Sequence, residues 1–368
     1  MPKPIKTTKR IDELDLLRGF FILVIIIDHI QRWPSPLTYL TGEGRLWVSA
    51  AEGFFIISGL LIGYLRGHKG LKKSFSEIST LLVKRAATLY LWSVIITFIG
   101  VWLVTVFHGN PELVPKLPEV TGLAYIWQVI SQQYTFDWIY FLRLYWIMLL
   151  VAPLAILLFR LKKWWLVPII SISLYGVSFL FAEPEAALQW QVLFFVPATI
   201  GFHLETIRDC FRRHPGYKKI ITLSLISTTL ITMILSYFWV LGWNYVESEN
   251  ARLSFNSYVS TRGWLDPLFT KAPLAVARVL LAFVWFGGLL ALFHIAKPFI
   301  TKWAGWLLMP FGQYSLTVYC LQAQALLCIQ FTVPTSENWL ANLFTTTVTV
   351  LLVWLLLKIP VVRRVLPQ

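Results

Sequence analysis

Hydrophobic residues along this chain gather in runs of about twenty, separated by shorter polar segments. A run of that length, wound as an α-helix, is long enough to cross the hydrocarbon core of a bilayer. The runs recur along the whole chain and leave no stretch long enough for a separate soluble domain. The sequence therefore predicts an all-α integral membrane protein, a polytopic bundle of about ten transmembrane helices in a single domain, residues 1–368.

The predicted spans are bounded by charged residues, prolines and turns. They cover residues 16–32, 46–66, 87–107, 138–159, 165–182, 189–205, 220–242, 273–294, 306–330 and 339–358. Two connections are long. Segment 108–137 begins Pro-rich and then becomes amphipathic, which is typical of a helix lying along the membrane surface, and segment 243–272 is rich in Trp, Asn, Arg and Ser.

Positive charge gathers on one side of this predicted topology. Lys and Arg cluster in alternate connections, in the basic N-terminus (1–15) and in the tail (359–368), whereas the other connections carry most of the carboxylates. Positively charged segments stay in the cytoplasm, so both termini are expected there. An even number of spans agrees with this placement.

Composition and charge exclude several other classes of protein. Only 14% of the residues are charged, against roughly 25% in soluble proteins. The net charge of +14 lies in short clusters between apolar runs, so it indicates topology and not nucleic-acid binding. Cys210, Cys320 and Cys328 form no CxxC pair, which argues against a disulfide framework or a metal site.

One face of the first predicted helix carries four ionisable side chains, those of Asp15, Arg18, His29 and Arg32. Arg18 and His29 are eleven positions apart, so they differ by about 20° around a helix and by roughly 16 Å along it. Ionisable groups are costly in lipid and usually face a cavity. His29 is a candidate general base, since imidazole titrates near neutral pH, and Arg18 could hold donor phosphates; the alternative for His29 is a structural role between helices.

Two carboxylates are candidate partners of His29. Asp28 is its neighbour in sequence, although adjacent residues point about 100° apart on a helix. Glu52 shares a face with Gly59 in a helix of closely spaced small residues, so it should look into the packed interior. The alternative for Glu52 is a structural ion pair with a helix neighbour such as Arg32.

Further polar groups lie in or beside other spans. They are Lys84, Arg85, Tyr90, Arg143 and Gln322. Lys84 and Arg85 can either anchor the third helix at the cytoplasmic surface or bind a donor. Arg143 should lie inside the apolar zone, and Gln322 can bind a sugar or join helices.

Several segments resemble the OpgC proteins. The specific ones are Leu14–Gly19 (LDLLRG), Ile27–Ile30 (IDHI) and Ser49–Phe55 (SAAEGFF) with Ser58-Gly59; weaker ones are Thr88–Tyr90, Leu144-Tyr145, Ala152-Pro153, Trp190–Phe194, Tyr314–Leu316 and Val318-Tyr319. The resemblance implies a polytopic membrane acyltransferase that substitutes periplasmic glucans with succinyl groups. It also implies that His29 is the catalytic residue.

Together these observations predict a membrane O-acyltransferase that uses acyl-CoA (succinyl-CoA or acetyl-CoA) as co-substrate, with no tightly bound cofactor and no metal. His29, with Asp28 or Glu52, is expected to be catalytic. Donor binding is expected at Arg18, Lys84, Arg85 and Tyr90, and acceptor binding at Arg32, Arg143, Tyr145 and Gln322, with Arg143 or Arg32 stabilising the oxyanion.

The expected partners are the acyl-CoA donor, a glycan acceptor and the lipid bilayer, and no nucleic acid; a homodimer is compatible with the sequence. The resemblance and the charge bias imply a multi-pass protein of the bacterial cytoplasmic (inner) membrane. A transporter or flippase for an acylated or anionic solute is the main alternative, because a polar stripe through a bundle also describes a substrate path. A glycosyltransferase using a lipid-linked sugar is the second.

Overall fold

The computed structural model describes residues 11–107, 114–183, 185–248 and 252–367. Within these ranges it is helical and contains no β-strand, which confirms the predicted all-α class. The longer helices are α1 (Asp12–Ile30), α3 (Ala50–Ile62), α4 (Phe75–Phe107), α6 (Tyr140–Arg160), α7 (Leu166–Ser178), α9 (Val192–Phe202), α10 (Leu204–Arg213), α11 (Pro215–Leu241), α13 (Phe255–Leu265), α14 (Val276–Ile295), α15 (Lys297–Gln313), α16 (Ser315–Thr332) and α17 (Trp339–Lys358). The shorter ones are α2 (Thr38–Thr41), η1 (Gly42–Gly44), η2 (Gly63–His68), η3 (Lys69–Lys72), α5 (Gly122–Ile130), η4 (Asp137–Ile139), α8 (Ala186–Trp190), α12 (Trp243–Val246), η5 (Asp266–Phe269) and α18 (Pro360–Val365).

Six helices in the described ranges are long and apolar enough to cross a membrane. They are Ala50–Lys72, Phe75–Phe107, Asp137–Arg160, Pro215–Leu241, Val276–Ile295 and Trp339–Lys358, and the pair Ala186–Phe202 and Leu204–Arg213, bent by 57°, would make a seventh. Helix α1 carries too many charged residues to belong to this set. The helices thus support a membrane protein, whereas ten spans and cytoplasmic termini stay predictions.

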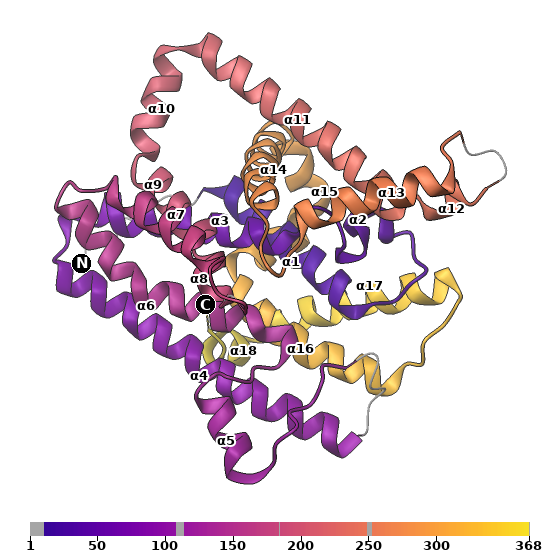
Figure 1. Cartoon of the computed structure of the whole chain (residues 1–368). Coiled ribbons are helices and arrows are strands. Elements are labelled where there is room, and N and C mark those ends of the chain that lie inside the picture. The colour runs from indigo at the N-terminus through magenta and orange to yellow at the C-terminus, as the bar shows by residue number, and fades with distance from the viewer. Residues whose placement is uncertain (1–10, 108–113, 184, 249–251, 368) are drawn as a thin grey trace.

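Helix α1 lies near the centre of the bundle, between α3 and α15 (Figure 1). Its closest neighbour is α15, and small residues make this approach possible: a Cβ atom at Gly19 would overlap the carbonyl oxygen of Leu308, and one at Gly312 would overlap that of Asp15. Helix α3 packs in the same way on α9 through Gly59. These contacts fix α1 and α3, which carry the candidate site.

Replacing Gly312 with alanine is expected to destabilise the protein. The added methyl group must push α15 away from α1 because it meets backbone and not the flexible end of a side chain. Overpacking of this kind costs about 1–3 kcal/mol or more, so thermal unfolding in detergent should occur at a lower temperature. The matched control is Gly176→Ala in α7, where a Cβ atom has no neighbour within 4 Å, and equal losses for both variants would refute this explanation.

The structure differs from several predicted spans, among them 165–182, which contains only the 13-residue helix α7. Residues 306–330 are not one helix, because α15 ends at Gln313 and α16 begins at Ser315; the intervening Tyr314 leaves helical geometry, with φ −116° and ψ 34°. Pro310 in the last turn of α15 removes a backbone donor there. Helix α4 begins at Phe75, twelve residues before the predicted span, and its added turns bury one face, formed by Ile78, Leu82 and Ala86.

Segments outside the predicted spans are also partly helical. Helix α5 lies in the amphipathic part of segment 108–137, and its apolar residues Leu123, Ile126 and Ile130 are exposed, as expected for a helix at a membrane surface. The basic N-terminus lies outside the described residues up to residue 10. In the tail, the carbonyl of Pro367 accepts a hydrogen bond from Thr317 in α16.

Candidate active site

His29 opens onto a cavity of about 940 Å³, here called the His29 cavity. It lies among α1, α3, η4, α6, α8, α16 and the turn before α14. Its carboxylates and amides are Asp28, Glu43, Asp137, Glu183, Gln31 and Gln189, and its aromatic side chains are Tyr140, Phe141, Phe179, Phe181, Trp190 and Tyr319. Aromatic faces beside hydrogen-bonding groups suit a polyhydroxylated ligand, because a sugar presents both apolar ring faces and hydroxyl groups.

The imidazole of His29 is half-buried at the end of α1. Its Nδ1 lies 3.5 Å from Nε2 of Gln322, a fully buried residue of α16 that does not line the cavity. Rotation of the Gln322 amide would instead present Oε1 to an Nδ1–H group, so this side chain can meet either tautomer. With the proton on Nδ1, the lone pair on Nε2 is available to a substrate.

Asp28 lines the same cavity and lies beside Thr41 and Gly44, on the segment that follows α1. It therefore faces the cavity next to His29 without a described contact to the imidazole. Gly44 has a left-handed φ of +69°, which suits glycine, and a Cβ atom there would come within 3.5 Å of the Asp28 carboxylate. The segment can thus approach Asp28 closely.

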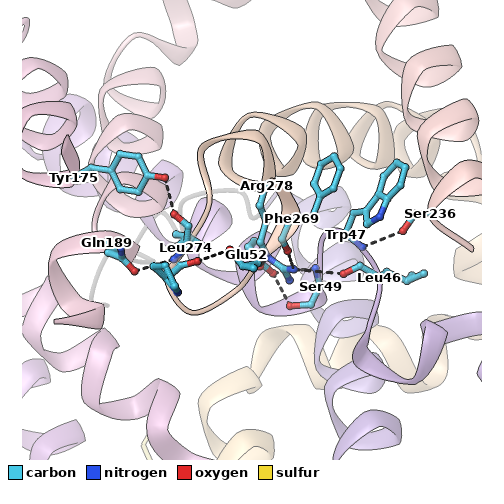
Figure 2. Close-up of polar contacts among 12 residues, drawn as sticks. Leu46, Trp47, Ser49, Glu52, Tyr175, Gln189, Ser236, Phe269, Leu274 and Arg278 are labelled. Carbon is cyan, nitrogen blue, oxygen red and sulfur yellow. Dashed lines mark hydrogen bonds and ion pairs between the residues drawn. The ribbon is translucent and has the colours of Figure 1, made fainter. Parts of the chain in front are cut away.

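Glu52 is bonded to Arg278, a residue of α14. Its Oε1 lies 2.5 Å from Nε of Arg278, and its Oε2 accepts hydrogen bonds from the backbone N (3.0 Å) and Oγ (2.5 Å) of Ser49 at the start of α3. Both partners of the ion pair are buried. Figure 2 shows this group beside the segment before α14. Glu52 therefore fixes the wall of the His29 cavity, and its ion-pair partner is neither His29 nor Arg32.

A second cavity, of about 280 Å³, lies toward the other end of α1 and is here called the Arg18 cavity. Three guanidinium groups line it, from Arg18, Arg66 and Arg85, together with Tyr145 and the carboxylate of Asp15. Arg66 is carried by the π-helical turn η2 and is close enough to Arg85 for charge repulsion. Such an excess of positive charge favours a multiply charged anion, and guanidinium groups match phosphate geometry.

Aromatic rings separate the two cavities. Phe54 and Tyr145 line the Arg18 cavity, and Phe141 and Tyr319 line the His29 cavity. The ring centroids of Phe54 and Phe141 are 5.1 Å apart, and those of Phe141 and Tyr319 are 5.6 Å apart. We call these four residues the aromatic wall. A ligand that extends from one cavity into the other must displace or pass these rings.

The remaining candidates line neither cavity. Arg32 donates to the carbonyls of Val333 (2.7 Å) and Pro334 (2.8 Å) and so joins the end of α1 to the end of α16. Arg143 pairs with Glu185 at 2.9 Å. Tyr90 donates to the carbonyl of Ile130 at 2.8 Å, which ties α4 to α5, and the exposed Lys84 lines neither cavity.

Sequence reasoning missed three cationic residues of the site, namely Arg66, Lys271 and Arg278. Arg278 had a usable signal, because it is an ionisable residue inside an apolar predicted span, like Arg143. Arg66 could not be distinguished from the basic anchors around it. Lys271 lies at the end of a long connection, and nothing in the sequence places it at the His29 cavity.

Comparison with known proteins gives the same family as the sequence motifs. The profile of the OpgC protein family matches residues 10–364, nearly the whole chain. No curated protein and no solved structure matches the chain. Membership of this family indicates a membrane acyltransferase in the general sense, which agrees with the helices described above. The chain belongs to the OpgC family.

Proposed function

We propose that this protein transfers an acyl group, succinyl or acetyl, from cytoplasmic acyl-CoA to a hydroxyl group of a periplasmic or extracellular glycan. One observation carries this proposal: a single helix, α1, contributes Arg18 to a cavity rich in guanidinium groups and His29 to a larger cavity rich in aromatic and hydrogen-bonding groups. The guanidinium groups of the Arg18 cavity suit the phosphates of a donor, and the aromatic and hydrogen-bonding groups of the His29 cavity suit a sugar.

The donor would bind at the Arg18 cavity. Its phosphates would lie against Arg18, Arg66 and Arg85, and its pantetheine arm would pass the aromatic wall toward His29. Arg18 and His29 are separated by roughly 16 Å along α1, a distance that an extended arm of this kind can span. The thioester carbonyl would then reach the His29 cavity while the nucleotide stays at the other end.

The acceptor would bind in the His29 cavity. Nε2 of His29 would take the proton from a sugar hydroxyl as its oxygen attacks the thioester carbonyl. The carbon–sulfur bond then breaks, the new ester stays on the sugar, and the imidazolium returns its proton to the leaving thiolate. Atoms and charge balance without a metal or a redox cofactor.

Replacing Arg85 with alanine is expected to raise the KM for acyl-CoA by about 10- to 100-fold, with a smaller effect on kcat. Removal of one charged hydrogen bond costs about 1.5–3 kcal/mol, and Arg85 lines the Arg18 cavity. Its neighbour Lys84 is exposed and lines neither cavity, so Lys84→Ala should change KM much less. Equal changes in KM for the two variants would contradict this arrangement.

The reaction itself is tested with purified protein in detergent. Free thiol is measured after addition of acetyl-CoA or succinyl-CoA, with and without a glucan acceptor, and the glucan is examined for ester by mass spectrometry. The proposal expects thiol release that depends on the acceptor and equals the ester formed. A transporter or flippase would produce neither, so the absence of both products from folded protein would favour that alternative.

A further inference from the structure

Lys271 is the only Lys or Arg that lines the His29 cavity among the described residues. It lies in the turn between η5 and α14, and its ammonium nitrogen is 5.9 Å from the ring centroid of Trp190. The ammonium group is also close enough to Asp28, His29 and Glu52 for charge interactions with all three. Lys271 therefore brings positive charge to the place where the proposed reaction occurs.

Hydrogen bonds hold the turn that carries Lys271 in one conformation. The carbonyl of Thr270 accepts from the backbone N of Ala275 at 3.1 Å, and the hydroxyl of Thr270 donates to the carbonyl of Pro273 at 2.9 Å. Both backbone polar groups of Leu274 are hydrogen-bonded. Its N donates to Oε1 of Gln189 at 2.8 Å, and its carbonyl accepts from the hydroxyl of Tyr175 at 2.7 Å. Figure 2 shows Leu274 between these two side chains.

Buried charge fixes the start of the same turn. Nη1 of Arg278 donates to the carbonyl of Phe269 at 3.0 Å, and Nε of Arg278 is paired with Glu52 (Figure 2). The backbone on both sides of Lys271 is thus tied to α3, α7, α8 and α14. Because the backbone is already ordered, the entropy lost when Lys271 binds a ligand is confined to the rotamers of its side chain.

Lys271 itself makes no hydrogen bond or ion pair with any residue that the structure describes, although four carboxylates line the cavity. Its side chain is exposed to the cavity. A cationic group that is positioned by its backbone but unpaired can meet a negative charge supplied by a substrate.

We propose that the Lys271 ammonium group contacts an anionic oxygen of the acyl group beside His29. This inference rests on the proposed function. The anionic oxygen has two sources in acyl transfer. One is the thioester carbonyl, which becomes an oxyanion when the sugar hydroxyl attacks, and the other is a carboxylate at the far end of a dicarboxylic acyl group such as succinyl.

The test compares wild type, Lys271→Met and Lys271→Arg with acetyl-CoA and succinyl-CoA, using kcat and KM for each donor. Methionine keeps the length of the side chain without its charge, and arginine restores the charge. Arg252→Ala is the matched control, because Arg252 is an exposed cation of the same connection that does not line the cavity. The control should behave as wild type, and unchanged unfolding temperatures exclude a structural effect.

Two results would support the inference, and they separate the sources. A loss in kcat of about 10²- to 10³-fold with both donors identifies the oxyanion. A rise in KM of about 10- to 100-fold with succinyl-CoA alone identifies the carboxylate. Partial rescue by Lys271→Arg is expected in either case.

Unchanged kinetics of Lys271→Met with every donor that the wild type uses would overturn the inference and leave the proposed function intact. Wild-type protein that transfers neither acyl group would refute the proposed function, and this inference with it. The two failures are thus distinguishable.

Discussion

Replacing His29 with alanine is expected to lower the rate of acyl transfer by about 10²- to 10⁴-fold, the usual contribution of a general base. The effect should fall on kcat, because the proposed mechanism has His29 act on the acceptor hydroxyl, whereas the donor phosphates would bind at the Arg18 cavity, which His29 does not line. The loss is measured as the rate at which free thiol is released from acyl-CoA in the presence of a glucan acceptor.

The folded state should survive this substitution. The described hydrogen-bonding neighbour of His29 is Gln322, at the long distance of 3.5 Å, so little structure depends on the imidazole. His214→Ala is the matched control, since His214 is exposed and lies at neither cavity. Wild-type rates in folded His29→Ala protein would remove the centre of the proposed mechanism.

Replacing Arg278 with methionine is expected to lower the free energy of unfolding by about 3–5 kcal/mol, because it leaves the fully buried carboxylate of Glu52 without its partner. The turn that carries Lys271 should loosen as well, since Arg278 also bonds the carbonyl of Phe269. Thermal denaturation of the protein in detergent measures the loss of stability.

The double variant Glu52→Gln with Arg278→Met provides an internal comparison. Removing both charges should cost less than removing Arg278 alone, because no unpaired charge remains buried. The control is Arg262→Met, which breaks the partly exposed pair of Arg262 with Asp266 and should cost about 0–1 kcal/mol. Equal losses for Arg278→Met and Arg262→Met would show that burial does not make the Glu52 pair special.

The helical class follows directly from hydrophobic run length, and the boundaries of α17 coincide with the predicted 339–358. Run length predicts the wrong helix boundaries where an apolar segment is broken into two helices, as between α15 and α16. Run length also predicts the wrong start where a helix extends beyond its most apolar part, as in the first turns of α4. A hydropathy average registers neither the proline in the last turn of α15 nor the single buried face, Ile78, Leu82 and Ala86, in the first turns of α4.

Some features of the site could likewise be predicted from the sequence, and others could not. Helical periodicity places Arg18 and His29 on one helix, and α1 indeed carries both, each at a different cavity. Periodicity cannot choose an ion-pair partner from a distant helix, so the bond of Glu52 to Arg278, 226 positions away, was not foreseen. Arg32 likewise bonds carbonyl groups about 300 positions away, which only the folded chain brings together.

The most direct test of this account uses sealed vesicles that contain the protein, with a glucan trapped inside and acyl-CoA outside. The account predicts ester on the trapped glucan and free thiol outside, in equal amounts, because the acyl group crosses between the Arg18 cavity and the His29 cavity. Ester that forms only when donor and glucan share one side would contradict the proposed transfer from a cytoplasmic donor to an acceptor across the membrane.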